Sequence, residues 1–299
     1  MLLVLQGPVQ ADPVRVPGTN VNLQPPAGFS PSESYPGFQS PEHQASIMVT
    51  QMPAPVAEIR KAMTKDLLAT RGITLLSSQE ETVDGREALL LQVAQAAGGA
   101  EYLKWMLVMG DPQTTYMIVG TFPKTAGEEV GAAIRKSLLT AAVTSAGPDN
   151  PFEGLLFRVT PTSALKIAGR VSNMLILTES GSAGTLPPGE PVYIVGSSIS
   201  PAAIADPKAF SEARAKQTEQ ITDLRIVTGR EITLGGLAAY ELLADAKDVK
   251  SGIAIRLYQV IVPDTGGYFI VQGLVGAERA GGMIPEFRRV TESFRKTGD

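Results

Sequence analysis

Two similar stretches of the sequence decide the fold. Residues 73–122 read ITLLSSQEETVDGREALLLQVAQAAGGAEYLKWMLVMGDPQTTYMIVGTF, and residues 224–275 read LRIVTGREITLGGLAAYELLADAKDVKSGIAIRLYQVIVPDTGGYFIVQGLV. Each contains four apolar runs separated by turn residues, a pattern that predicts four strands joined by hairpins. A helical pattern with one apolar face follows each stretch. We infer that one strand-and-helix module occurs twice in the chain.

Three short matches align the two copies. They pair residues 82–85 with 233–236, Lys104 and Trp105 with Arg256 and Leu257, and residues 117–120 with 270–273. The offset in residue number drifts from 151 to 153 along these matches. Short loop insertions between the copies account for such a drift.

Length and charge limit the class of protein. The chain has 299 residues, and an ordinary domain has about 150, which agrees with two copies. Residues 1–150 hold 10 Lys and Arg against 14 Asp and Glu, and residues 151–299 hold 16 against 16. Neither half has the basic excess that binds phosphates, so we expect no nucleic-acid partner. No apolar run approaches the ~20 residues of a membrane-spanning helix, so we expect no integral membrane segment.

The N-terminus is apolar, and the chain has no cysteine. Residues 1–5 read MLLVL, and residues 8–13 resemble a small-residue cleavage site, so we interpret residues 1–19 as a flexible N-terminus or signal-peptide remnant. A periplasmic or secreted location follows, with a cytoplasmic location as the alternative. The lack of cysteine excludes disulfides, thiolate metal sites and a thiol nucleophile.

Two helices are predicted in the first copy. The first covers residues 55–71, where Pro55 suits the first turn and Gly72 suits the end. The second begins after Thr125, because Thr125 and Glu128 form a capping-box pattern. The strands are expected near residues 74–83, 86–94, 101–109 and 115–122, with Asp84 and Gly85 as a hairpin turn.

The second copy follows a polar, Pro- and Gly-rich linker over residues 145–151. Asp206 and Pro207 are typical of a helix start. Its first strands are expected near residues 155–160, 164–168, 172–178 and 191–197. We therefore predict an α+β protein with two tandem domains, residues 20–147 and 148–299. Each is expected to hold a mainly antiparallel sheet of about six strands covered by two helices.

The element order resembles the PsbP-like superfamily, which includes DcrB-like proteins and the Ran-binding MOG protein. The resemblance rests on the turn at residues 26–29, the strand at 45–50, the helix at 55–71, and four strands closed by a helix. It implies an α/β/α sandwich in two copies, mostly non-enzymatic binding or assembly roles, and no shared catalytic motif or cofactor. Residues 157–179 depart from the pattern, because they lack the Pro-Ala-Gly-Phe turn.

Catalytic and metal-binding motifs are weak. His43 is the single histidine and lies in a polar loop, so we expect a surface residue and no zinc site. Ser163 and Lys166 match the S-x-x-K pattern of serine acyl-enzymes, which needs both on one helical turn; the segment instead reads as extended. We therefore predict no catalytic, cofactor-binding or metal residues.

Paired carboxylates are interpreted as structural. Glu80 and Glu81 are neighbours on a strand and so point to opposite faces. Glu128 and Glu129 lie in the first turn of a helix, where negative charge complements the helix dipole.

Two features could bind a ligand. Aromatic and thioether side chains of two neighbouring strands either line an apolar cleft or form sheet core: Tyr102, Trp105, Met106, Tyr116 and Met117. The Gly- and Pro-rich segment 180–189 could be a binding loop.

Three functions remain open. The first is a non-catalytic secreted or periplasmic accessory or assembly protein that binds an unknown protein partner or the envelope, in an unknown oligomeric state. The second is a carrier of an apolar small molecule, for which a cavity lined by Trp105 or its neighbours would argue. The third is a serine hydrolase that uses Ser163 and Lys166.

Overall fold

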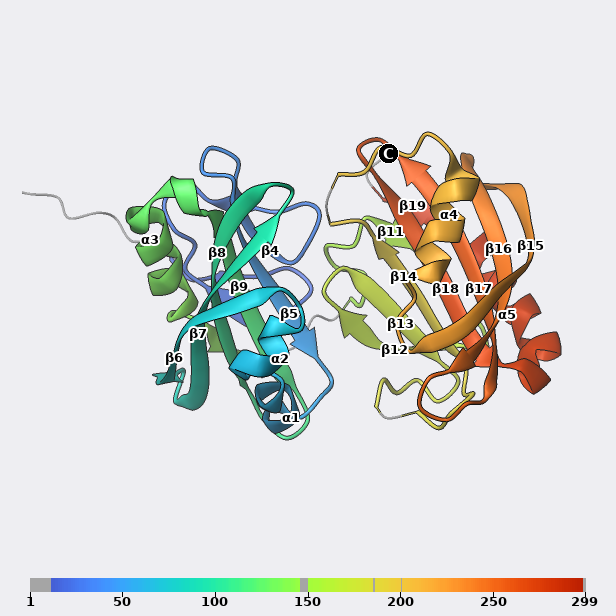
Figure 1. Cartoon of the computed structure of the whole chain (residues 1–299), viewed down its shortest axis with the longest axis horizontal. Helices are drawn as coiled ribbons and strands as arrows, with labels where there is room; N and C mark the ends of the chain where they lie inside the picture. Colours follow the sequence, from blue (N-terminus) through green and yellow to red (C-terminus); the bar gives the residue numbers. More distant parts are fainter. Residues whose placement is uncertain (1–11, 146–149, 185, 200, 298–299) are drawn as a thin grey trace, which may run out of the picture. The chain divides into compact units, whose positions relative to one another are not determined.

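The structure is a computed structural model that describes residues 12–145, 150–184, 186–199 and 201–297 (Figure 1). The chain divides into two compact units, residues 1–153 and 154–299, and each is described by itself. The apolar residues 1–11 of the predicted signal remnant lie outside the described residues, as does part of the predicted linker. No helix in the described parts of the chain is both long and apolar enough to cross a membrane.

The first unit is built on one antiparallel sheet of seven strands, whereas the sequence predicted about six. Their order across the sheet is β3 (Ser30–Pro31), β4 (Gly37–Ser40), β5 (Ala45–Met52), β9 (Thr115–Pro123), β8 (Ala100–Gly110), β7 (Arg86–Ala97) and β6 (Ile73–Val83). The hairpin between β6 and β7 turns at Asp84 and Gly85, which both have positive φ, as a tight two-residue turn requires. The predicted turn is therefore confirmed.

One face of this sheet is covered by two short helices, α1 (Val56–Lys61) and α2 (Lys65–Ala69). The prediction of one helix over residues 55–71 is wrong. The side chain of Thr64 accepts a hydrogen bond from the backbone N–H of Leu67 and so starts a second helix. The apolar stripe holds in part, because Val56, Ile59 and Met63 pack on the sheet, but Leu67 is exposed.

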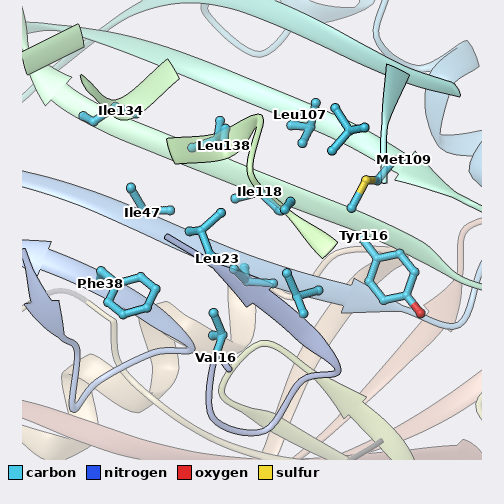
Figure 2. Close-up of a cluster of buried hydrophobic side chains, with 14 of the residues drawn as sticks. Val16, Leu23, Phe38, Ile47, Leu107, Met109, Tyr116, Ile118, Ile134 and Leu138 are labelled. Atoms are coloured by element: carbon cyan, nitrogen blue, oxygen red, sulfur yellow. The ribbon is translucent and has the colours of Figure 1, made fainter. Parts of the chain in front are cut away.

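The other face carries α3 (Glu128–Leu138) and a small sheet of β1 (Val14–Arg15), β2 (Val21–Leu23) and β10 (Ala142–Val143). Figure 2 shows the apolar side chains that pack between these layers. The predicted flexible segment thus needs a correction over its described part. Val16 and Thr19 are buried, and the small sheet fixes the chain there.

The predicted capping box at the start of α3 is also wrong. Thr125 lies in a preceding 3-10 turn, η1 (Lys124–Ala126). Gly127 is the residue that caps α3, without a side-chain hydrogen bond and with φ of 88°. A positive φ of this kind favours glycine.

The second unit repeats the strand order of the first. Its sheet runs β12 (Lys166–Val171), β13 (Met174–Thr178), β14 (Val192–Ser197), β18 (Gly267–Gly276), β17 (Ala254–Asp264), β16 (Leu237–Asp248) and β15 (Ile221–Leu234). The short strands β11 (Phe157–Arg158) and β19 (Arg295–Lys296) pair as β2 and β10 do. The first three strands of each sheet, β3 to β5 and β12 to β14, therefore correspond to each other despite their different sequences.

Two helices cover the second sheet. α4 (Pro207–Lys216) begins at Asp206, whose side chain accepts from the backbone N–H of Ala209, so the predicted helix start is confirmed. α5 (Ala280–Glu292) follows the 3-10 turn η2 (Ala277–Arg279) and corresponds to α3. Together the two units form a tandem α+β architecture with mainly antiparallel sheets.

Strand register corrects one of the three sequence matches. Trp105 pairs with Gly120, and Tyr258 pairs with Gly273, so Trp105 corresponds to Tyr258 and not to Leu257. The match of Lys104 and Trp105 to Arg256 and Leu257 is one residue off, a shift that would move every side chain to the opposite face. The other two matches agree with the register.

Both extra residues of the second copy lie in one loop. The β7–β8 hairpin turns at Gly98 and Gly99, whereas the β16–β17 loop spans residues 249–253. The residue offset is 151 before this loop and 153 after it. A bulge in the edge strand also recurs, at Leu76 in β6 and at Val227 in β15.

Candidate functional site

A groove in the first unit is the candidate site, and we call it the α3 groove. It lies between α3 and the sheet and has a volume of about 530 Å³, within the range of small ligand sites. Its ten lining residues are Gln92, Leu103, Trp105, Phe122, Lys124, Gly127, Glu128, Gly131, Ala132 and Arg135. It is partly open to solvent.

The groove exists because one side of α3 carries small residues. Gly127, Gly131 and Ala132 follow one another on the face that lines it. Gly131 lies so close to the ring of Phe122 that an added Cβ would be 2.7 Å from the ring's Cζ. The helix therefore approaches the sheet closely there without filling the space beside it.

The floor of the groove is apolar. Leu103 and Trp105 come from alternate positions of β8, so both point to the α3 face. Both pack against the buried core of this face, as Phe122 does from β9, yet Trp105 stays partly exposed. A partly exposed tryptophan beside a depression is typical of recognition sites.

Two cations stand at the wall. The guanidinium of Arg135 lies over the Trp105 ring at 5.6 Å from its centroid, a cation–π contact. Arg135 Nη2 also donates to Glu81 Oε1 at 2.9 Å, and Lys124 Nζ donates to Glu101 Oε2 at 2.9 Å. The Lys124 pair is exposed and the Arg135 pair is partly exposed, and surface ion pairs of this kind stabilise a fold by about 0–1 kcal/mol. The cations are therefore available to an incoming anion.

The same place in the second unit is filled. Ile284 stands where Gly131 stands and is buried, and Val275 replaces Phe122. Tyr258, at the position of Trp105, is fully buried, and its hydroxyl donates to Thr291 Oγ1 at 3.0 Å. The large and small partners have exchanged places, and the second unit buries all three of these side chains.

The second unit also has an arginine at the position of Arg135, but this arginine makes different contacts. Arg288 occupies the position of Arg135 and donates to Glu241, a buried carboxylate that also accepts from Arg230. Burial alone would raise the pKa of Glu241, but hydrogen bonds and charge from Arg288 and Arg230 lower that pKa below its ordinary value. In the first unit Leu90 stands at the position of Glu241, so Arg135 is not held in this way.

The predicted aromatic cleft is divided by the sheet. Trp105 and Tyr116 belong to the core on the α3 face, whereas Met106 and Met117 belong to the core on the α1–α2 face. Tyr102 shares the side of Met106, by the alternation of β8. These five side chains therefore do not line one cleft, and Trp105 is the one that reaches the groove.

The interpretation of the first carboxylate pair is confirmed. Glu80 pairs with Arg60 of α1, and Glu81 pairs with Arg135 of α3, on opposite faces of β6. Of the second pair, Glu128 lies in the first turn of α3 and lines the groove, a location that the sequence alone did not indicate.

The S-x-x-K pattern lacks its structural context. Ser163 lies in a bend and Lys166 begins β12, and both are exposed, so they do not share a helical turn. His43 is in a turn and is partly exposed. Among the described residues, no group of three His, Asp or Glu side chains is placed to hold a metal ion.

The ends of the predicted binding loop are tied to η2. Arg279 Nη2 lies 2.6 Å from Glu179 Oε1, and Arg279 Nη1 lies 3.1 Å from Glu190 Oε1. These two ion pairs flank residues 180–189 and bring the two ends of the segment together. The loop is thus anchored at its base, and it stays a prediction as a binding element.

Sequence reasoning missed Phe122, Gly131 and Arg135. A usable indication was present in the repeat itself. The α3 positions Gly127 and Gly131 are small, whereas their counterparts Ala280 and Ile284 are larger and buried. A loss of side-chain volume at matching helix positions marks a place where one copy leaves space.

Comparison with known proteins adds likenesses of low identity. No family model matches the chain, and no curated protein matches it by sequence. Among solved structures, LpqN of Mycobacterium tuberculosis, described as involved in cell envelope biogenesis, is 14% identical, with 48% of this chain and 83% of LpqN covered and a TM-score of 0.34. CyanoP, the cyanobacterial PsbP of Synechocystis, is 13% identical, with 48% and 99% covered and a TM-score of 0.32.

A third likeness spans both units. The immunity protein TplEi of the Pseudomonas aeruginosa type VI secretion system is 11% identical, with 93% of this chain and 95% of TplEi covered and a TM-score of 0.34. Likenesses at these scores carry no functional argument.

Proposed function

We propose that this protein is a non-catalytic accessory protein of the PsbP-like type that acts outside the cytoplasm, in the periplasm or as a secreted protein. Its first unit binds a partner protein in the α3 groove, and its second unit is the closed copy of the same module. One observation carries the proposal: the groove of the first unit is filled by Ile284 and the buried Tyr258 in the second.

The chemistry of the lining suits recognition. Its polar members are an amide, two cations and one carboxylate, and its floor is aromatic and aliphatic. Such a set offers hydrogen bonds, ion pairs and a stacking surface, which are the elements of an interaction hot spot. An accessory role needs no more than these.

A second function is kept because the position of Trp105 favours it. A carrier of an apolar small molecule would use the same floor of Leu103, Trp105 and Phe122. Small-molecule sites bury roughly 70–90% or more of their ligand's surface, whereas this groove is partly open to solvent. The openness favours the partner protein over the carrier.

A closed-groove variant tests the proposal. The double substitution F122V/G131I installs the residues that fill the second unit, Val275 and Ile284, so the helix and sheet keep a known pairing. We expect wild type to capture a defined protein from an envelope extract of the native host and the closed-groove variant to lose it. Equal capture by both proteins would contradict a role for the groove.

The extracytoplasmic location has its own test. The apolar residues 1–5 support export. We expect the protein to fractionate with periplasmic or secreted proteins when it is expressed from its native locus. Recovery with cytoplasmic markers alone would contradict this part of the proposal.

A further inference from the structure

We infer that the α3 groove recognises the carboxyl-terminal residue of a partner polypeptide, with an apolar side chain against the floor of Leu103, Trp105 and Phe122 and the chain-end carboxylate on Arg135. This inference rests on the proposed function and names the chemistry of the partner. The first unit holds both halves of the necessary site, apolar and cationic, next to each other.

The apolar half accepts one side chain. Leu103, Trp105 and Phe122 form the floor, and Gly131 lets α3 lie close to the Phe122 ring. Ligand sites span roughly 300–1,000 Å³, and this groove lies in the lower part of that range. A phenylalanine or leucine side chain fits within such a volume and would pack against this apolar floor.

The cationic half is held in position. The cation–π contact with Trp105 fixes the guanidinium of Arg135 beside the apolar floor. Glu81 is its single hydrogen-bonding partner among the described residues, and this bond uses one nitrogen of the planar fork. The remaining N–H groups suit a carboxylate, which arginine binds in a bidentate manner.

Charge complementarity favours an anionic ligand. Of the ten lining residues, Lys124 and Arg135 are cationic and Glu128 is acidic, so the lining carries a net positive charge. Glu81 and Glu101, which pair with the two cations, are not lining residues. A carboxylate can therefore approach Arg135 from the groove side.

A chain end fits better than a free acid. The groove is partly open to solvent, so a ligand bound in it can continue into solvent. The last residue of a polypeptide places an apolar side chain and a carboxylate on one Cα atom. This compact pair matches the adjacency of Trp105 and Arg135.

The single tryptophan gives a direct readout, because Trp105 is the only one in the chain. We would titrate the full-length protein with the peptide N-acetyl-Ala-Leu-Phe carrying a free carboxylate, and with the same peptide as its amide, and follow Trp105 emission. The acid should give a saturable change, and the amide should bind at least tenfold more weakly. The closed-groove variant F122V/G131I should show no saturable change.

Matched arginine variants test the carboxylate. R135Q should weaken binding of the acid at least tenfold, because it removes the cation at the groove. R60Q removes the same charge from the opposite face of β6, where Arg60 pairs with Glu80, and should bind as wild type does. Both arginines lie on covering helices at the surface, so both variants should fold.

Several results would overturn the inference. Equal binding of acid and amide would exclude carboxylate recognition, and equal losses in R60Q and R135Q would exclude this site. If 3-phenylpropanoate bound as tightly as the peptide, the groove would recognise a free carboxylic acid and not a chain end. If the peptide fails to bind but F122V/G131I still loses the host partner, this inference falls while the proposed function stands.

Discussion

The two units share one strand order and fill their α3 and α5 faces with different chemistry. Where the first unit uses Val21, Ile47 and Ile134, the second uses Phe157, Tyr193 and Phe287, all fully buried. Phe287 contacts Tyr193 with ring centroids 5.5 Å apart, inside a larger aromatic cluster. One backbone therefore supports aliphatic side chains at these three positions in the first unit and aromatic side chains in the second.

The opposite faces differ in polarity. Met106 and Val119 lie under α1 and α2, and their counterparts under α4 are Gln259 and Gln272. Gln259 Nε2 donates to the carbonyl and hydroxyl oxygens of Ser211 at 2.8 Å, and Gln272 Nε2 donates to Gln259 Oε1 at 2.9 Å. The second unit thus holds its helix with a satisfied amide network, which a buried polar group requires.

The largest predicted effect tests whether α3 and α5 pack on their sheets in an equivalent way. Gly120 lies against Ile134, and Gly273 lies against the ring of Phe287, at the same crossing of helix and sheet. Gly120→Ala and Gly273→Ala should each destabilise their own unit by about 3 kcal/mol, because a Cβ overpacks the crossing. Trp105 fluorescence in denaturant reports the first unit, and hydrogen exchange of β18 reports the second. Loss in one unit with no effect in the other would break the equivalence.

The next prediction tests the ion pair with Glu241 that Arg288 forms and Arg135 lacks. Glu241→Gln keeps the size of the side chain but removes its charge, so the second unit should lose about 2 kcal/mol at pH 7. The lowered pKa of Glu241 means that its charged form stabilises the fold above the ordinary glutamate pKa. That stabilisation is lost as pH falls below the ordinary value and through the folded pKa.

Hydrogen exchange of β16 and α5 measures this loss. Wild type and Glu241→Gln should differ at pH 7 and converge under acidic conditions, after correction for intrinsic exchange rates. A difference that persists unchanged in acid would show that the carboxylate charge is not the cause.

A smaller effect probes the amide network under α4. Gln259→Met alone removes the donor to Ser211 and one of the two acceptors of Gln272 Nε2, which keeps Thr218 Oγ1, and should cost about 1.5 kcal/mol. The double variant Gln259→Met/Gln272→Val installs the residues of the first unit and should recover most of this loss, because both amides of the network are gone. A double-mutant cycle by chemical denaturation, followed by hydrogen exchange, measures the coupling. Simple additivity of the two losses would contradict the network.

The smallest effect is a gain. Gly282 lies within α5 with open space around its Cα, so an added Cβ meets no atom. Gly282→Ala should stabilise the second unit by about 0.5–1 kcal/mol, from helix propensity alone. A loss at this position would mean that α5 needs the glycine for a reason that its packing does not reveal.

Local patterns in the sequence predicted much of the fold. Apolar alternation located the long strands, and Asp84 with Gly85 and Asp206 with Pro207 marked a hairpin and a helix start because their side chains and φ preferences act locally. The single helix over residues 55–71 was wrong, because the apolar stripe runs through a break that Thr64 capping creates. Register in β8 was wrong by one residue, because cross-strand partners decide it and local sequence does not.

The candidate site was predicted only in part. Trp105 was singled out as an aromatic residue on a strand, but its supposed neighbours lie on the other face or deeper in the core. The groove depends on Gly131 meeting Phe122 and on Arg135 reaching back over Trp105. These contacts join residues that lie 9 and 30 positions apart in the chain, so no local pattern contains them.

Quenching of Trp105 by acrylamide tests most directly whether the first unit is open where the second is closed. Trp105 is the single tryptophan, so its emission reports the groove floor alone. We predict that F122V/G131I lowers the Stern–Volmer constant at least twofold relative to wild type and shifts the emission to shorter wavelength. An unchanged constant, in a variant that stays folded by circular dichroism, would contradict the account of an open groove.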